Sequence, residues 1–210
     1  MFVELLCLVY RKKSEAKTAN ILDGETKIKA ELAFQILLSW KYTLQGKTGI
    51  PSIHENPGPY PFPGWQDDNG INEQVLQKWI KEARKIAEQE DRIGVCDSEI
   101  GHIIAYAAYD PEDNAWPHKA VRNVIESNYS KDLASGIITE QFNKRGVTTR
   151  GIYEGGVQEL DLAKSVREWA KLTKTSWPKT SDILKTIGNM WENESKRSDV
   201  EVEVRKLGDL

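Results

Sequence analysis

Many segments of the chain repeat their apolar residues every three or four positions, as one face of an α-helix does. The clearest is 72–91, where Asn72 suits an N-cap and Ile71 and Leu76 stand at the two positions of a hydrophobic staple. The same spacing predicts helices over 2–11, 27–44 and 157–173, and further helices that begin at Asp97, Trp116-Pro117, Ser130 and Trp177-Pro178. The pattern predicts an all-α fold, a single multi-helix domain of about seven or eight helices.

Two of these segments carry a more detailed prediction. The apolar arc of 27–44 is so wide that little of the helix is left for solvent, which predicts a central, buried helix. Gly94 is expected to end the helix at 72–91, and Asp97 to cap the next one. On that next helix, Glu99, His102 and Tyr106 share the polar side, so we expect them to face solvent.

The segment 45–70 interrupts the helical pattern with closely spaced prolines and glycines, so it is predicted to be one long extended loop. Its aromatic residues Tyr60, Phe62 and Trp65 are expected to hold it against the surface. The role of 51–65 stays open, because such a stretch is also typical of ligands for proline-recognition domains.

The end of the chain, 196–210, is a charged tail whose pattern allows two interpretations. Val200, Val202 and Val204 alternate with charged residues as in a strand, whereas Val200, Val204 and Leu207 also fit one face of a helix. The expected organisation is therefore an N-terminal helix and linker at 1–26, a helical domain at 27–195 and this tail.

Composition narrows the class of protein. The 29 basic and 32 acidic residues give a net charge of −3, which argues against a surface that grips nucleic acid throughout. Cys7 and Cys96 lack any pairing motif and indicate reduced thiols in a cytoplasmic protein. The apolar run at 1–10 is too short to span a membrane, so no membrane partner is expected.

The sequence contains no motif that fixes a reaction. Gly46-Lys47-Thr48 lacks the earlier glycine of a phosphate-binding loop, since Lys41 stands there. His54, His102 and His118 do not have metal-ligand spacing, so no metal and no cofactor is predicted. An enzyme is therefore less favoured than a binding protein, without being excluded.

The segment 142–159 is the densest cluster of chemically distinctive residues, and three interpretations of it remain open. In the first interpretation the glycines are architectural and allow turns and close approach of the backbone: Gly146, Gly151, Gly155 and Gly156. Alternatively, Lys144, Arg145 and Arg150 bind an anion or nucleic acid at a helix N-terminus. In the third interpretation, an active site uses the following side chains: Arg145, Arg150, Tyr153 and Glu154.

A further set of short matches extends over much of 30–195: Trp79, Ala83-Arg84, Ile100-Gly101, Trp116-Pro117, Val121-Arg122, Ile125-Glu126, Asn143, Arg145-Gly146-Val147, Arg150, 154–159 and Trp177-Pro178. In these features the chain resembles the C-terminal helical region of large multi-domain bacterial proteins of uncharacterised function. The resemblance implies a terminal module of a longer bacterial polypeptide in a defence or mobile-element context. It implies no active-site residue.

Together these features favour a non-enzymatic helical interaction or scaffold module. Its expected partner is another protein or a set of upstream domains, and self-association is left open. The alternative is a nucleic-acid-associated module that uses the basic, glycine-rich joint at 143–156, with Lys144, Arg145 and Arg150 as its contacts.

Overall fold

The computed structural model describes residues 1–10, 12, 24–44, 62–66, 70–145 and 149–208. Within these ranges the chain forms eight helices and no strand, which confirms the predicted all-α fold. The helices are α1 (Phe2–Val9), α2 (Gly24–Leu44), α3 (Glu73–Gln89), α4 (Ile93–Ile104), α5 (Lys119–Asn128), α6 (Lys131–Asn143), α7 (Val157–Thr173) and α8 (Pro178–Gly208).

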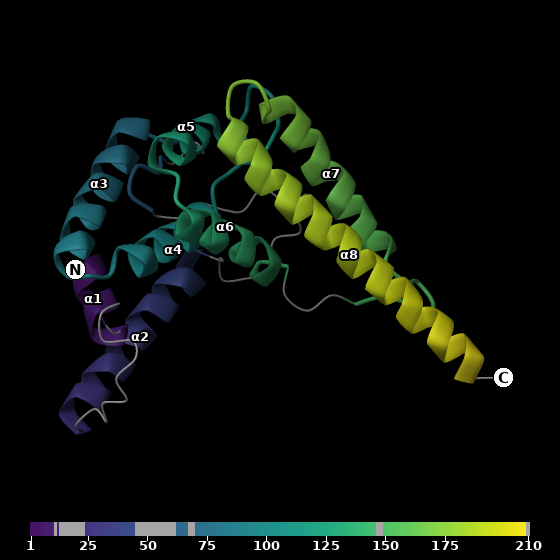
Figure 1. Ribbon diagram of the computed structural model, residues 1–210, viewed down its shortest axis with the longest axis horizontal. Coiled ribbons are helices and arrows are strands. Elements are labelled where there is room, and N and C mark those ends of the chain that lie inside the picture. Colours follow the sequence, from purple (N-terminus) through teal and green to yellow (C-terminus); the bar gives the residue numbers. More distant parts are fainter. Residues whose placement is uncertain (11, 13–23, 45–61, 67–69, 146–148, 209–210) are drawn as a thin grey trace.

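The helices are arranged as a body with two projections (Figure 1). The body consists of α3 to α6, with α4 and α6 packed closely against each other. On one side α2 extends away from the body and packs against α1, which in turn contacts α3 and α4. On the other side α7 and α8 form a long hairpin that contacts α5 and α6 through α8.

The close packing of α4 and α6 depends on two glycines. A Cβ at Gly101 would lie 2.3 Å from the carbonyl oxygen of Leu133, and one at Gly136 would lie 2.1 Å from that of Ser98. These distances are far below van der Waals contact, so the two backbones approach as closely as they do only because both positions lack a side chain. The crossing fixes which side chains of α6 meet α4.

Local sequence signals explain several helix starts. Asn72 accepts a hydrogen bond from the Val75 N–H at 3.1 Å, and Ser130 accepts one from the Leu133 N–H at 3.0 Å. Both are the predicted N-caps. The hairpin helices α7 and α8 also begin at the predicted residues, Val157 and Pro178.

The expected boundary between α3 and α4 is wrong. The turn is made at Asp91, whose φ is 54°, and α4 already begins at Ile93, so Gly94 lies inside it. Asp97 is not a cap: its buried carboxylate accepts hydrogen bonds from Arg84 on α3 at 2.7 and 2.6 Å. The same carboxylate cannot both cap a helix and form a bidentate ion pair, and in this structure Asp97 forms the ion pair.

The prediction of a central, buried helix at 27–44 is wrong for the described side chains, which lie in its first half. The segment is helical, but Ile28, Leu32 and Ile36 are 59%, 61% and 53% exposed. Ala33 is the buried residue among the described side chains of α2. The core is instead supplied by α3 to α8 together with two residues of α1, Val3 and Leu6.

The end of the chain is helical, since α8 continues without a break to Gly208. Of the two interpretations of 196–210, the helix is therefore correct through Gly208.

Phe62 is buried and packs edge to face against Trp65, with ring centroids 5.2 Å apart. Tyr60 and the remainder of 51–61 lie outside the described residues. Among the described helices none is long and apolar enough to cross a membrane.

Replacing Gly136 with alanine tests the close packing of α4 and α6. Intrinsic helix propensity alone would make alanine more stabilising by up to about 1 kcal/mol. We expect the opposite, a loss of about 3 kcal/mol or more in the free energy of unfolding, because the new Cβ overlaps a backbone carbonyl. Urea-induced unfolding followed by circular dichroism measures the difference.

Gly188→Ala in α8 is the matched control. The nearest atom to its new Cβ would be Cγ of the Arg167 side chain, at 3.0 Å, and the nearest backbone atom would be 3.6 Å away. We expect that variant to stay within about 1 kcal/mol of the parent protein. Equal effects of the two substitutions would contradict the role assigned to Gly136.

Candidate functional site

The two arginines predicted as ligand contacts converge on one buried carboxylate. Arg145, just after α6, and Arg150, in the segment before α7, both donate hydrogen bonds to Oε1 of Glu159 in the first turn of α7. The Arg150 distance is 2.7 Å. Glu159 is 0% exposed. Its charge is therefore compensated inside the protein by two guanidinium groups.

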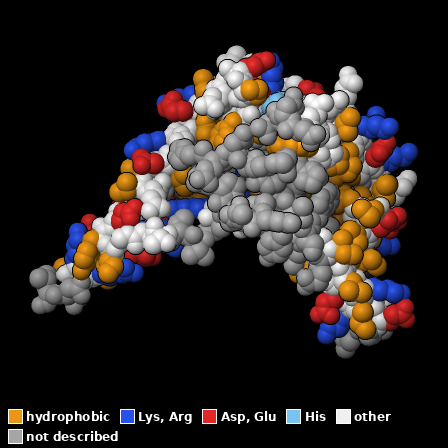
Figure 2. Space-filling view, turned by 180° about the vertical axis from the view of Figure 1, so that it is seen from behind, with side chains coloured by type: hydrophobic (Ala, Val, Ile, Leu, Met, Phe, Trp, Pro, Cys, Tyr) orange, Lys and Arg blue, Asp and Glu red, His pale blue; other side chains and the backbone are white. Residues whose placement is uncertain are grey.

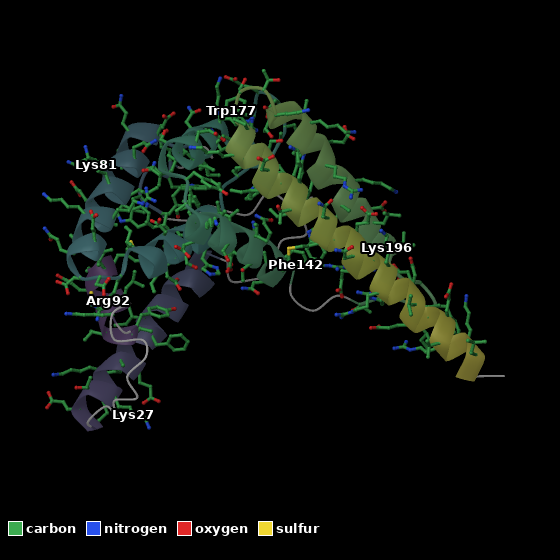
Figure 3. All side chains as sticks on the ribbon, viewed as in Figure 1. Lys27, Lys81, Arg92, Phe142, Trp177 and Lys196 are labelled. Carbon is green, nitrogen blue, oxygen red and sulfur yellow. The ribbon has the colours of Figure 1, made fainter. Side chains whose placement is uncertain are left out.

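The same cluster connects three helices. The guanidinium of Arg145 lies over the Trp191 ring of α8, 5.2 Å from its centroid, and Phe142 at the end of α6 stacks on that ring at 3.9 Å. Figure 3 shows Phe142 where α6 reaches the hairpin. Arg150 also donates to Oγ of Ser198 on α8 at 2.9 Å. The cluster thus fastens the hairpin to the body.

The glycines of this segment allow close contact with α8. A Cβ at Gly156 would lie 2.2 Å from the carbonyl oxygen of Ser195, and one at Gly155, whose φ is +64°, would lie 2.3 Å from Oδ1 of Asp199. The Gly156 N–H donates to the same Asp199 oxygen at 2.8 Å. The geometry supports the architectural interpretation for these two glycines.

The other two glycines contribute less to that interpretation. A Cβ at Gly151 would meet nothing closer than Glu154 at 3.8 Å, so space does not require glycine there. Gly146 lies outside the described residues.

Tyr153 and Glu154 do not join the arginine cluster. Glu154 is exposed and accepts hydrogen bonds from the Gly151 N–H and from Gln158, both at 2.8 Å. Tyr153 is more than half exposed, and Nζ of Lys206 lies 5.9 Å from its ring centroid. The four side chains of the predicted active site are therefore not brought together around one point.

Lys144 has its ammonium group inside the body, although part of its side chain reaches the surface. Nζ donates to the carbonyl oxygen of Ala105 at the end of α4, at 2.7 Å, and lies 5.1 and 5.7 Å from the ring centroids of Tyr106 and Trp116. Burial lowers the pKa of Lys144 to about 8, against the opposing effect of Glu140. The ammonium group of this lysine thus pairs with a carbonyl oxygen at a helix C-terminus.

A buried polar cluster between α4 and α6 was not predicted. The carboxylate of Glu140 accepts hydrogen bonds from the Tyr106 hydroxyl and from Nδ1 of His102, the latter at 2.7 Å. Burial raises the pKa of Glu140, but the hydrogen bonds from His102 and Tyr106 outweigh it and hold that pKa below its usual value. The expectation that Glu99, His102 and Tyr106 face solvent is wrong: they are buried or nearly so.

A sequence signal for this cluster existed but was ambiguous. His102 and Tyr106 are four residues apart at the end of the helix predicted from Asp97, as are Glu140 and Lys144 at the end of the helix predicted from Ser130, so each pair is expected on one helix face. Such spacing is equally common on solvated faces. Glu159 gave no signal of its own, because the two arginines that bind it are nine and fourteen residues away.

The side chains of both clusters mainly hold helices together. The basic groups of Lys144, Arg145 and Arg150 are bound to a carbonyl oxygen and to a carboxylate, which leaves little charge directed at an external anion. No three His, Cys, Asp or Glu side chains in the described ranges lie close enough together to hold a metal ion. Both clusters lock helices to one another.

Fold and clusters together define an all-α protein with a polar interior at its helix crossings. No protein-family model, curated protein or solved structure matches the chain. The resemblance to the C-terminal region of large bacterial proteins therefore stays an expectation.

Replacing Glu159 with glutamine tests how far the hairpin depends on the arginine cluster. The substitution keeps the shape of the side chain but leaves two guanidinium groups without their carboxylate. Removing one partner of a buried ion pair costs about 3–5 kcal/mol, and we expect a loss in that range from the free energy of unfolding. Glu154→Gln, on the exposed side of the same segment, should leave the free energy of unfolding nearly unchanged.

Lys144 predicts a specific dependence of stability on pH. Its pKa is about 8 in the folded state and near its ordinary value of 10.5 in the unfolded chain. Between these values the unfolded chain binds more protons, so stability rises with pH. The cost of the buried charge is fully present below pH 8 and is gone above pH 10.5.

The comparison protein is Lys144→Met, which keeps the length of the side chain and removes the titration. Urea unfolding of both proteins should show the parent gaining stability relative to the variant as the pH rises from 7 to 10.5. A difference that does not change with pH would contradict the burial of this ammonium group.

Proposed function

We propose that this chain is a non-enzymatic, helical protein-interaction module and that α2 is its docking element. The observation that carries the proposal is the exposed apolar row Ile28, Leu32 and Ile36, in which every side chain is more than half exposed. Figure 2 shows hydrophobic side chains gathered over the arm of α1 and α2, at the lower right. Single exposed apolar residues are normal, but an aligned row on a projecting helix is typical of a binding surface.

The spacing of the row indicates what would bind it. Residues four apart form a ridge along a helix, and ridges of this kind pack into the grooves of another helix. From Ile28 to Ile36 the ridge extends about 12 Å, close to two turns. The occupant we propose is therefore an amphipathic helix of a partner protein that lays its apolar face on α2.

The charges beside the row favour a partner with little net charge on its binding face. The described charged residues near the row are two acids and two bases, Glu25, Glu31, Lys27 and Lys29. Glu25 and Lys29 already form an ion pair at 2.6 Å. A nucleic acid or a strongly acidic segment would find no excess of positive charge here.

Substituting the row tests this function. The double variant I28E/L32E should remain folded, since exposed substitutions change stability by about 0.5 kcal/mol or less each. We expect it to retain less than about a tenth of the partner captured by the immobilised parent protein from lysate of its native cells, as quantified by mass spectrometry. Lys27→Glu, an exposed charge change on the same helix, should capture the partner as the parent does.

Cross-linking then identifies the segment that binds. The cross-linked peptide should come from an amphipathic helix and should disappear with I28E/L32E. Unchanged capture by the double variant, or cross-links that avoid α2, would reject α2 as the docking element.

A further inference from the structure

A second exposed surface lies on the part of α8 that extends past α7. Contact between Gly156 and Ser195 marks the level at which α7 begins, so 199–208 continues beyond it (Figure 1). The side of α8 that faces the rest of the protein carries Trp191, Ser195 and Ser198, all buried. The opposite side of the helix therefore faces away from α6 and α7.

That opposite side carries a heptad pattern. Six exposed residues follow one another at sequence spacings that alternate between three and four, as the a and d positions of a coiled coil do: Met190, Asn193, Arg197, Val200, Val204 and Leu207. Its last three members are apolar and are 57%, 63% and 72% exposed. Figure 2 shows hydrophobic and charged side chains mixed along this arm at the lower left. The seam extends about 26 Å, from Met190 to Leu207.

The residue types of the seam favour a parallel pair of helices. Val204 occupies an a position and Leu207 a d position, a combination that favours two strands. Lys196 and Glu201 occupy the flanking g and e positions, which in a parallel pair face each other across the interface, five residues apart.

We propose that the end of α8 pairs with the same segment of a second copy of this chain, as a short parallel coiled coil over Met190–Leu207. The charges on both flanks are complementary for this partner: Lys196, which pairs with Glu192 of its own chain at 2.8 Å, would in addition face Glu201 of the other chain, twice in each interface. Arg197 at an a position is held by Glu194 and Glu201 of its own chain, at 3.0 and 3.6 Å, so its charge is compensated at the edge of the seam.

Analytical ultracentrifugation of the full chain at concentrations up to several hundred micromolar tests the pairing. We expect the parent protein to approach twice its chain mass of 23.9 kDa. Val204→Glu should raise the dissociation constant at least about tenfold. Arg205→Gln, which lowers the net charge equally at an exposed position outside the seam, should leave it within about twofold. A parent protein that stays monomeric throughout would overturn the proposal.

Charge reversal tests the parallel arrangement. Lys196→Glu alone and Glu201→Lys alone should each weaken pairing about three- to tenfold, since each places like charges opposite one another. The double variant K196E/E201K should recover pairing to within about threefold of the parent protein. A double variant that pairs no better than the single ones would overturn the parallel arrangement.

The α2 variant I28E/L32E serves as a further control. Its pairing should equal that of the parent protein, because α2 lies on the other side of the body. Loss of pairing in that variant would assign self-association to α2 and overturn the role of α8. Failure of the coiled coil alone would leave the proposed function of α2 untouched.

Discussion

The approach of α4 to α6 at Gly101 and Gly136 sets the geometry on which the other contacts depend. Because the two backbones touch there, Glu140 on α6 reaches His102 on α4 and Tyr106 just after it, and Lys144 reaches the carbonyl end of α4. The same orientation carries the end of α6 to the hairpin. A wider crossing would separate these hydrogen-bonded groups, and buried polar groups that lose their partners are costly.

The hairpin is held by a second group of buried charges. Arg145 and Arg150 each contact Glu159, and Phe142 stacks on Trp191 beside them. Residues of a kind that usually mark ligand sites are thus used here between helices. Exposed apolar side chains of the described residues include the row on α2 and the end of α8, and binding at either surface would rest on burial of apolar area rather than on charge.

Signals that act within a few residues predicted much of the fold. Asn72 and Ser130 cap helices because their side chains reach backbone N–H groups three residues on, and Pro178 starts α8 as its sequence indicated. The prediction failed for Asp97, because its carboxylate pairs with Arg84 of another helix. It also failed for the polar face of α4, because His102 on that face binds Glu140 of α6 and is not solvated. The pattern of apolar and polar residues predicts which residues share one face of a helix. It does not predict which other segment that face packs against.

By itself the sequence determined that the chain is helical, where most helices begin and which residues of the joint at 142–159 are chemically distinctive. Only the tertiary structure decided that Lys144, Arg145 and Arg150 bind groups of the protein itself and that the apolar row of α2 stays outside. The physical reason is the separation along the chain over which each kind of interaction acts. Helix formation depends on neighbours three and four positions away, whereas burial depends on which helices fill the limited space around α4 and α6, a competition between segments far apart in the chain.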